Sequence, residues 1–561
     1  MLYVSLFLIK MYRISLVFIF SLFILSFLQV DHLSPWNNFY SNFFILASFF
    51  FLILILIQSY NEKFNIDKIA YFLLFFIITS FFQFFFNDKY FQDIIIQITY
   101  LILVFIIYVF FNNFFKIDDN YQNSNILNYF IWGFIISSIF SSYIGFYQFF
   151  NPWYGELWVF PLQGNRIYAN LGQPNQLATL ILLGILSVGY LNRNKNNILL
   201  ILIPFFSSAL YLTQSRTVWT FIIVGVVVLI IKRKLITKQF FTFFTFFIFC
   251  YFSNFYINFE NSLGAKLNVS ERLTSGYLRI EMWRDYIEVI KNNTNIVGHG
   301  WGSIEKLNFI YGSYSQEYFF SYHNIIFDMY VFFGIPALFF IAFLIYKIYF
   351  IFLKIESIKE LSLFIILLAF INHAMLEFPL YYWYFLFPFL VVFSYLNNSV
   401  FNKENLILKI EKNFFIFIFF IIFISIFISF ILYDKNRSIY RNDFLGICEN
   451  NEKYYFFDRF KDVNYIVCYN VNNIKDLKLL EDKVLKMPSK NYLLNLIYIY
   501  DYHGLYVKRD FLLKKYRKKY DNNLTLDELR LNNFKLTRIL LKPMIPLLEW
   551  LACFDDILVS T

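Results

Sequence analysis

Histidine is rare in this chain of 561 residues, and two of its five histidines lie in motifs that suggest acid–base chemistry. His323 and Asn324 open a long apolar segment in "SYHNIIFDMY", and His373 and Glu377 stand four residues apart in "HAMLEFP". Histidine changes charge near neutral pH and often serves as a general base. The N-terminus of the predicted helix should keep His323 neutral and able to accept a proton. The alternative is that His323 and Asn324 only cap that helix.

The spacing of His373 and Glu377 places them on one face of a helix, where they could bind a metal ion or each other. The sequence has neither an HExxH motif nor a cluster of residues that would supply a third metal ligand. We therefore expect a His–Glu hydrogen bond, no metal and no cofactor. The sequence also lacks a Walker A motif and a Rossmann glycine pattern, so nothing suggests the use of a cytoplasmic nucleotide.

Two arginines are candidates for binding a phosphate group, because the guanidinium fork donates paired hydrogen bonds to phosphate oxygens. Arg216, in "QSRT", lies between the short apolar runs 197–212 and 217–231, near the hydrocarbon boundary. Arg279 belongs to "YLRIEMWRDYIEVI", an amphipathic stretch with aromatic residues of interfacial type. The alternatives are that Arg216 reaches the interface from a helix end and that Arg279 contacts lipid headgroups.

Polar side chains also gather in "RIYANLGQPNQLATL", which covers residues 166–180. Buried polar groups are costly unless they are paired or hydrated, so this cluster needs a polar surrounding or a ligand. A second polar motif, "GHGWGS" at 298–303, brings three glycines around His299 and Trp301 and predicts a tight turn. The candidate binding residues of the first motif are Arg166, Asn170, Gln173, Asn175 and Gln176.

The elements that must position these residues are membrane helices. The chain is 59% hydrophobic, and apolar runs long enough to span a bilayer recur from end to end. The net charge of +10 is explained by topology and not by nucleic acid. We predict thirteen spans, near 12–29, 43–59, 68–86, 92–111, 127–150, 174–191, 197–212, 217–231, 239–256, 324–346, 360–377, 383–398 and 413–432.

Lysine and arginine set the orientation of these spans. They cluster before the first span and after spans two, six, eight, ten and twelve, which makes those loops cytoplasmic. The polar motifs then all lie on the outer face, which is periplasmic or extracellular. The predicted outer segments are 30–42, 87–91, 151–173, 213–216, 257–323, 378–382 and the region after 433.

The predicted fold is thus an all-α polytopic membrane protein with about 12–13 transmembrane helices and a large periplasmic loop at 257–323. We divide the chain into a transmembrane domain, 1–432, and a polar, lysine-rich periplasmic domain, 433–561. The leucine spacing in "KDLKLLEDKVLKM" predicts that this second domain is mostly helical. If it is exported, Cys448 and Cys468 are candidates for a disulfide.

The order of these motifs resembles the bacterial protein O-oligosaccharyltransferases, the pilin-glycosylating branch of the O-antigen ligase and polymerase superfamily. The resemblance rests on "DHLSPW", "NLGQPNQLAT", "QSRTVW", "RIEMWRDYI" with "GHGWGS", "HNIIFDMYVFFGIPA" and "HAMLEFPLYYWYF", and it covers residues 30–390. Three positions depart from the pattern of that family. Asn42 stands where an acidic residue is common, His299 where an apolar residue is usual, and Tyr168 where small residues are common.

This resemblance implies a GT-C-like enzyme that moves an oligosaccharide from undecaprenyl diphosphate to a serine or threonine hydroxyl, without a metal or a nucleotide sugar. The partners would be the lipid-linked glycan, an acceptor such as pilin and the bilayer, with no nucleic acid. His323 would be the base, and Arg216 and Arg279 would bind the diphosphate. The residues expected to bind substrate are Arg166, Asn170, Gln173, Asn175, Gln176, Trp301, His373, Glu377 and Tyr382.

Two other functions stay open at this stage. One is an O-antigen ligase or polymerase, which has the same chemistry and a different acceptor. The other is a transporter or flippase of lipid-linked sugar, which should show internal repeats or broken helices and polar groups along its whole path. In this sequence the polar groups gather at one end, which argues against transport.

Overall fold

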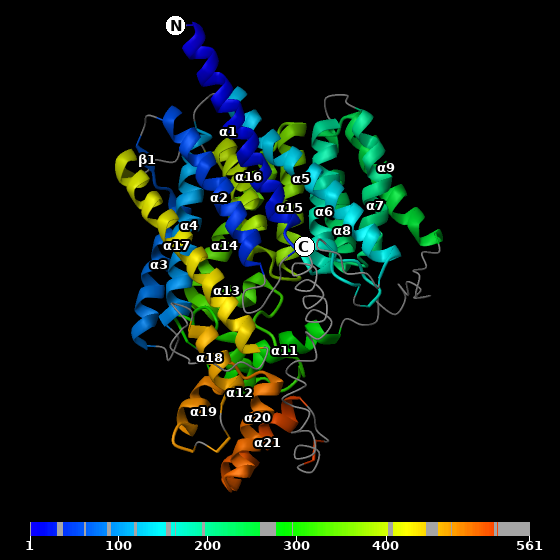
Figure 1. Ribbon diagram of the computed structural model, residues 1–561. Coiled ribbons are helices and arrows are strands. Elements are labelled where there is room, and N and C mark those ends of the chain that lie inside the picture. The colour runs from blue at the N-terminus through cyan, green and yellow to red at the C-terminus, as the bar shows by residue number, and fades with distance from the viewer. Residues whose placement is uncertain are drawn as a thin grey trace, which may run out of the picture.

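The computed structural model is almost entirely helical, and most of the helices form one bundle (Figure 1). Described residues are 2–30, 38–60, 63–86, 91–116, 120–152, 159–162, 164–192, 197–257, 277–293, 295–401, 408–444, 458–469, 471–472, 474–520 and 524–525. The motif "DHLSPW", including His32, and Cys448 lie outside the described residues.

Each of the thirteen predicted spans coincides with a helix or a pair of helices. Their bounds are α1 (Leu2–Leu28), α2 (Phe39–Leu56), α3 (Lys68–Phe86), α4 (Phe91–Phe114), α5 (Asn120–Phe150), α6 (Pro174–Asn192), α7 (Leu202–Leu212), α8 (Arg216–Ile231), α9 (Lys238–Ser253), α13 (Ile325–Phe333) with α14 (Ile335–Lys354), α15 (Ile358–Ala374), α16 (Trp383–Phe401) and α17 (Lys412–Phe444). Short 3₁₀ turns flank some of them, at Ile57–Ser59, Ala169–Leu171, Asn197–Ile201, Arg233–Leu235, Asn254–Tyr256 and Pro379–Tyr381.

These helices confirm the predicted class of an all-α polytopic membrane protein. Within the described part of the chain, seven helices are long and apolar enough to cross a membrane, and four more apolar helices are shorter. α6 is largely buried among its neighbours, whereas α14 and α17 expose most of their apolar side chains at the edge of the bundle. The exact number of spans stays a prediction.

The predicted tenth span is broken in two at Gly334. This glycine has φ 66° and ψ −146°, a backbone conformation that residues other than glycine rarely adopt. A Cβ atom at Gly334 would lie 2.0 Å from the backbone oxygen of Ile296. Because Ile335 N donates to that same oxygen over 2.9 Å, the break docks the turn before "GHGWGS" against the junction of α13 and α14.

Two loops that were predicted to share the cytoplasmic side meet at one end of the bundle. β1 (Phe64–Asn65) pairs antiparallel with β2 (Lys409–Ile410), and an ion pair joins Lys63 to Glu411. Those loops follow the second and twelfth predicted spans. Their pairing agrees with the alternation of sides used to predict the topology.

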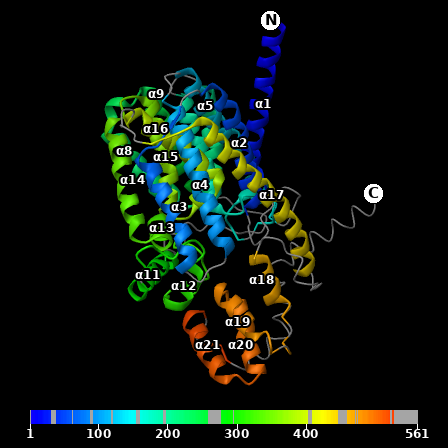
Figure 2. The same cartoon turned by 90° about the vertical axis from the view of Figure 1, so that its left-hand side faces the viewer.

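The opposite end of the bundle carries the second group of helices (Figures 1 and 2). α11 (Tyr277–Asn292) and α12 (Ile304–Tyr311) lie between the bundle and α19 (Leu477–Lys486), α20 (Lys490–Tyr502) and α21 (Tyr506–Lys519). α18 (Asp458–Val467) lies beside them, in contact with α17. α18–α21 pack around a small core of their own, which includes Leu480, Leu496 and Tyr516 and also Phe309 from α12.

The predicted domain boundary falls inside a helix, since α17 continues without interruption from Lys412 to Phe444. The division at residue 432 therefore stays a prediction about function and not a visible break in structure. Cys468 is disulfide-bonded, but its predicted partner lies outside the described residues.

Candidate active site

Glu377 is the centre of a cluster of polar side chains at the end of the bundle that carries α11. It lies in the loop after α15, with its side chain 7% exposed. Arg279 on α11 approaches Glu377 Oε1 to 2.8 Å, and His323 Nδ1 approaches Oε2 to 2.7 Å. Asn175 on α6 donates to Oε1 over 2.8 Å. Three segments far apart in the sequence thus meet at one carboxylate.

The electrostatics of the cluster keep Glu377 ionised. Burial alone would raise its pKa, but the hydrogen bond from His323 and the positive charge of Arg279 outweigh burial and hold the pKa of Glu377 below its usual range. A carboxylate next to imidazole Nδ1 accepts a hydrogen bond from Nδ1–H, which favours the tautomer with its lone pair on Nε2. His323 therefore has the arrangement of an oriented base, as in a carboxylate–histidine pair.

The segment before α13 fixes the position of His323. The residue has a positive φ of 55°, and its backbone N–H donates to Ser321 Oγ. Asn324, and not His323, is the N-cap of α13, because its side-chain oxygen accepts from Ile326 N over 3.0 Å. The imidazole is thereby turned away from the helix toward Glu377, with 22% of its side chain exposed.

Asp328 supports this turn and was not identified from the sequence. It is fully buried, and its carboxylate accepts from Tyr322 N, Ser321 Oγ and Tyr381 OH at distances of 2.8, 2.5 and 2.8 Å. The sequence did contain a signal, an acidic residue inside the apolar run "IIFDMY", because ionisable groups in such runs usually have a function.

The polar motif at the start of α6 forms the second wall of the site. Asn175 Oδ1 accepts from Arg166 Nη2 and from Ser215 Oγ, each over 2.9 Å, while its amide nitrogen binds Glu377. Gln173 Nε2 lies 3.5 Å from Glu377 Oε2. Arg166 also donates to the backbone oxygen of Thr213 over 2.8 Å. Asn175 therefore links the loops before α6 and α8 to the central carboxylate.

The other two amides of this motif point into the protein. Asn170 is fully buried and donates to the backbone oxygen of Phe27. Gln176 accepts from Tyr384 OH over 2.7 Å. In this structure both serve to join helices, and the predicted contact of these two residues with sugar stays a prediction.

The predicted hydrogen bond between His373 and Glu377 is wrong. α15 ends at Ala374 and the chain turns, so Glu377 does not stay on the helical face of His373. His373 Nδ1 instead lies 2.7 Å from Thr179 Oγ1 on α6, and the ring is buried. The helix end was the missing information, since a spacing of four residues implies a shared face only while the helix continues.

The remaining predicted residues lie around this cluster. Arg216 is the first residue of α8, directly after Ser215, and is partly exposed. Trp301 stacks on Phe332, with ring centroids 5.7 Å apart, and its backbone N–H donates to Gln97 over 2.6 Å. Tyr382 stacks on Tyr384, with ring centroids 5.5 Å apart. Trp301 and Tyr382 thus belong to the aromatic wall beside the polar cluster.

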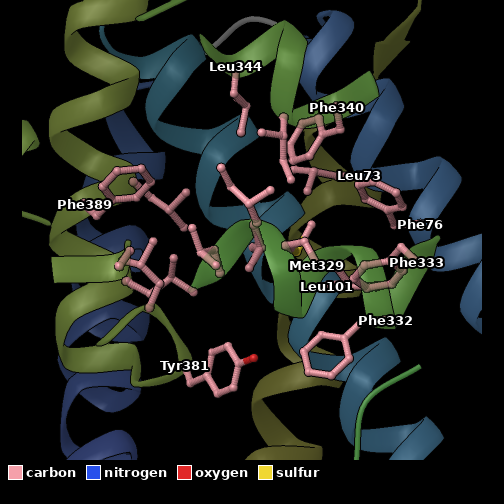
Figure 3. Close-up of a pocket in the computed structure, with 18 of the residues that line it drawn as sticks. Leu73, Phe76, Leu101, Met329, Phe332, Phe333, Phe340, Leu344, Tyr381 and Phe389 are labelled. Atoms are coloured by element: carbon pink, nitrogen blue, oxygen red, sulfur yellow. The ribbon is translucent and has the colours of Figure 1, made fainter. Parts of the chain in front are cut away.

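An apolar cavity of about 280 Å³ lies beside the polar cluster (Figure 3). Trp301 and Tyr381 line it, as do Ile325 and Met375, which are close neighbours in sequence of His323 and Glu377. Figure 3 shows Tyr381 and Phe332 at one end of the cavity and Leu344 and Phe340 toward the other. The cavity therefore lies in the apolar body of the bundle, between α3, α4, α13, α14, α15 and α16, with one end next to the site.

Comparisons with known proteins match three parts of the chain to described families. The O-antigen ligase family matches residues 198–342, the protein glycosylation ligase family matches 167–191, and the family of the C-terminal part of the virulence factor membrane-bound polymerase matches 361–525. The first match covers Arg216, Arg279 and His323, and the second covers the amide motif at the start of α6. No solved structure matches the chain.

Two curated relatives come from Acinetobacter baylyi. The chain is 28% identical to a ComP-specific O-oligosaccharyltransferase over 358 residues, which are 60% of this chain and 63% of the relative. It is 26% identical to a general O-oligosaccharyltransferase over 248 residues, which are 41% of this chain and 43% of the relative. The chain thus spans less than two thirds of the length of each relative.

The helical bundle and these matches define a membrane protein of the O-antigen ligase superfamily, a class of glycosyltransferases. Within that superfamily, the match to the protein glycosylation ligases and the similarity to the two relatives support the pilin-type O-oligosaccharyltransferase branch. The resemblance predicted from the sequence is confirmed.

Proposed function

We propose that this protein transfers an oligosaccharide as one block from undecaprenyl diphosphate to a serine or threonine hydroxyl of an acceptor protein such as pilin. The site would face the periplasm at the outer surface of the bacterial inner membrane. The observation that carries this proposal is the cluster of Glu377, His323 and Arg279 beside an apolar cavity. It combines an oriented base, a cation for phosphate and space for a lipid.

His323 is the base in this proposal. A serine or threonine hydroxyl is a weak nucleophile at neutral pH and needs a base within hydrogen-bond reach. With its Nδ1–H hydrogen-bonded to the Glu377 carboxylate, His323 takes the hydroxyl proton on Nε2. The hydroxyl oxygen then bonds to the anomeric carbon from the face opposite the diphosphate. The bond from that carbon to the phosphate oxygen breaks, and undecaprenyl diphosphate leaves with the electron pair. Because attack and departure occur on opposite faces, the configuration of the anomeric carbon is inverted.

Arginine side chains stabilise the leaving diphosphate in this mechanism. Negative charge grows on the phosphate as the bond breaks, and fixed cations lower that barrier. Arg279 is held in place by Glu377, and Arg216 begins the helix that follows Ser215. Because the side chain of Arg279 is 18% exposed, part of its donor set remains accessible from the site.

The apolar cavity accommodates the first isoprene units of the carrier. Its wall is aliphatic and aromatic, as a polyprenyl chain requires. Because Tyr381 and Met375 line it close to Glu377 in the sequence, a chain that extends from it toward the site would place the diphosphate near Arg279. The expected sugar contacts of Asn170, Gln173, Asn175, Gln176, Arg166, His373, Trp301 and Tyr382 belong to the same proposal. Gln173 and Asn175 are the best placed of these, since both reach Glu377.

An O-antigen ligase is the second candidate, because that family matches residues 198–342. The experiment that separates the two candidates gives purified enzyme one lipid-linked glycan and two acceptors in competition, a pilin and a lipid A core. We expect glycan on the pilin, measured by the mass of the intact protein. Transfer to the lipid alone would identify a ligase. Movement of the lipid-linked glycan across a vesicle bilayer with no transfer would identify a transporter.

A further inference from the structure

A buried ion pair joins the C-terminal helices to the helix that carries Arg279. Lys519, the last residue of α21, approaches Asp285 Oδ2 on α11 to 2.8 Å. The two side chains are 3% and 0% exposed. The two residues are 234 positions apart in the chain, so the contact is a tertiary one.

Asp285 is also the anchor of the loop after α12. Its two carboxylate oxygens accept from the backbone N–H groups of Ser313, Tyr314 and Ser315, at 2.6, 2.7 and 3.1 Å. With Lys519 it therefore has four donors. A carboxylate with so many fixed partners holds α11, this loop and α21 in one relative position.

α11 transmits this position to the site. Asp285 lies six residues after Arg279, which is about 9 Å along a helix. Between them, Trp283 Nε1 donates to the backbone oxygen of Tyr322 over 3.0 Å, next to His323. One residue after Asp285, Tyr286 stacks on Phe327 of α13, with ring centroids 4.2 Å apart. α11 is thus fixed near its middle, at Asp285, by the C-terminal helices, and at Trp283 and Tyr286 by the segment that carries the base.

Stability alone does not explain a buried pair of charges. Desolvation of two ions can offset their attraction, so such pairs are weak evidence for stability. Burial lowers the pKa of Lys519 in spite of the adjacent carboxylate. An apolar side chain at this contact would avoid the cost of desolvating two charges. Phe309 of α12 provides an apolar contact of this kind with the same C-terminal core. The ion pair adds a fixed register that apolar contacts do not provide.

We propose that Lys519 is a positioning residue, which acts through Asp285 and α11 to hold Arg279 at the site. The C-terminal helices are then part of the transferase machinery and not only an appended domain. This inference rests on the proposed function, in which Arg279 binds the diphosphate of the donor. It predicts that the loss of Lys519 weakens the use of the donor without affecting the use of the acceptor.

The test measures transfer by the full-length purified protein at varied donor and varied acceptor. In Lys519→Met we expect the KM for carrier-linked glycan to rise about fivefold or more, because a small displacement of a binding group has a large kinetic effect. The KM for the acceptor should be unchanged. Lys519→Arg should restore the donor KM to within about twofold, because it keeps the cation. Lys519→Gln serves as a second neutral variant if the methionine variant does not fold.

Lys508→Met is the matched control. Lys508 lies on the same helix, its side chain is 54% exposed, and its Nζ pairs with Glu481 Oε1 inside the C-terminal region over 2.7 Å. Its donor KM should stay at the wild-type value. A lower kcat with unchanged donor KM in Lys519→Met would indicate only a loss of folded protein and would overturn the inference. Arg279→Ala distinguishes a failure of the proposed function from a failure of the positioning role of Lys519. A normal donor KM in that variant contradicts the proposed function, whereas a raised value there with a normal value in Lys519→Met contradicts only the positioning role.

Discussion

At the scale of single residues, Glu377 joins the proposed base, the proposed phosphate ligand and the amide motif of α6. Its oxygens bind His323, Arg279 and Asn175 within 2.8 Å. A neutral amide in its place would offer one acceptor oxygen and one amino group, which would face a donor. We therefore regard Glu377 as the residue that orients the site, and not as a sugar ligand only.

The first prediction follows from this arrangement. Glu377→Gln should lower transfer by about a hundredfold or more, because general-base catalysis contributes that much and the imidazole would lose its fixed tautomer. The measurement is turnover with saturating donor and acceptor. The control is Glu356→Gln, which changes the same side chain at an exposed position before α15. Equal activity in Glu377→Gln and wild type would remove Glu377 from the mechanism.

Arg279→Lys tests the role of the guanidinium. Lysine keeps the charge but loses the fork that could bind Glu377 and phosphate together. We expect most of the transfer activity to be lost, while the protein still inserts in the membrane and stays folded when it is extracted in detergent. Transfer is followed by glycan on the acceptor, and insertion by membrane fractionation. Wild-type transfer by this variant would reduce Arg279 to a contact with lipid headgroups.

Residue types were predictable from the sequence, but their pairing was not. His323, Arg279 and Glu377 were all identified as candidates, because ionisable residues stand out in an apolar chain. The partner of Glu377 was assigned wrongly as His373, since the sequence did not reveal that α15 ends at Ala374. Lys519 and Asp285 gave no local signal at all, because their contact depends on the folding of two distant segments.

At the scale of elements, the thirteen apolar runs were sufficient to place the bundle helices, since each run coincides with a helix or a pair of helices. The break at Gly334 was missed, because one glycine in an apolar run is compatible with a continuous helix. The break has a consequence for the site. It separates the short α13, which begins next to His323, from the long and exposed α14.

Gly334→Ala tests this break. An alanine there would adopt a strained backbone conformation and its Cβ would meet the oxygen of Ile296, so we expect a loss of about 1–3 kcal/mol or more in the free energy of unfolding. The measurement is thermal unfolding in detergent. Gly225→Ala on α8 is the control, because its Cβ would meet Phe244 at an ordinary 3.5 Å. Equal melting temperatures for the two variants would show that the break is not fixed by Gly334.

At the scale of the whole molecule, the two ends of the bundle differ. The β1–β2 pair and the Lys63–Glu411 ion pair lie at one end, and the candidate site, α11 and the C-terminal helices lie at the other (Figures 1 and 2). The distribution of lysine and arginine assigns the first end to the cytoplasm. The orientation of the bundle therefore rests on this distribution of charge.

A topology reporter tests this orientation. A reporter that is active only in the periplasm should be active when it is fused after residue 561 and silent when it is fused at Lys234. The charge of the loop around Lys234 should retain that loop in the cytoplasm. A matched reporter that is active only in the cytoplasm should give the opposite pattern. If both patterns were reversed, the candidate site would face the cytoplasm and the lipid-linked donor would have to be cytoplasmic.

The measurement that tests the central claim most directly is transfer by His323→Ala, with purified carrier-linked glycan and acceptor protein. We predict that this variant folds and binds the donor, that transfer falls to the background level, and that carrier-linked glycan accumulates in cells. His373→Ala is the comparison, because that buried imidazole contacts Thr179 instead of Glu377 and should retain measurable transfer. Near-normal turnover in His323→Ala, with His373→Ala inactive, would contradict the account and move the base to α15.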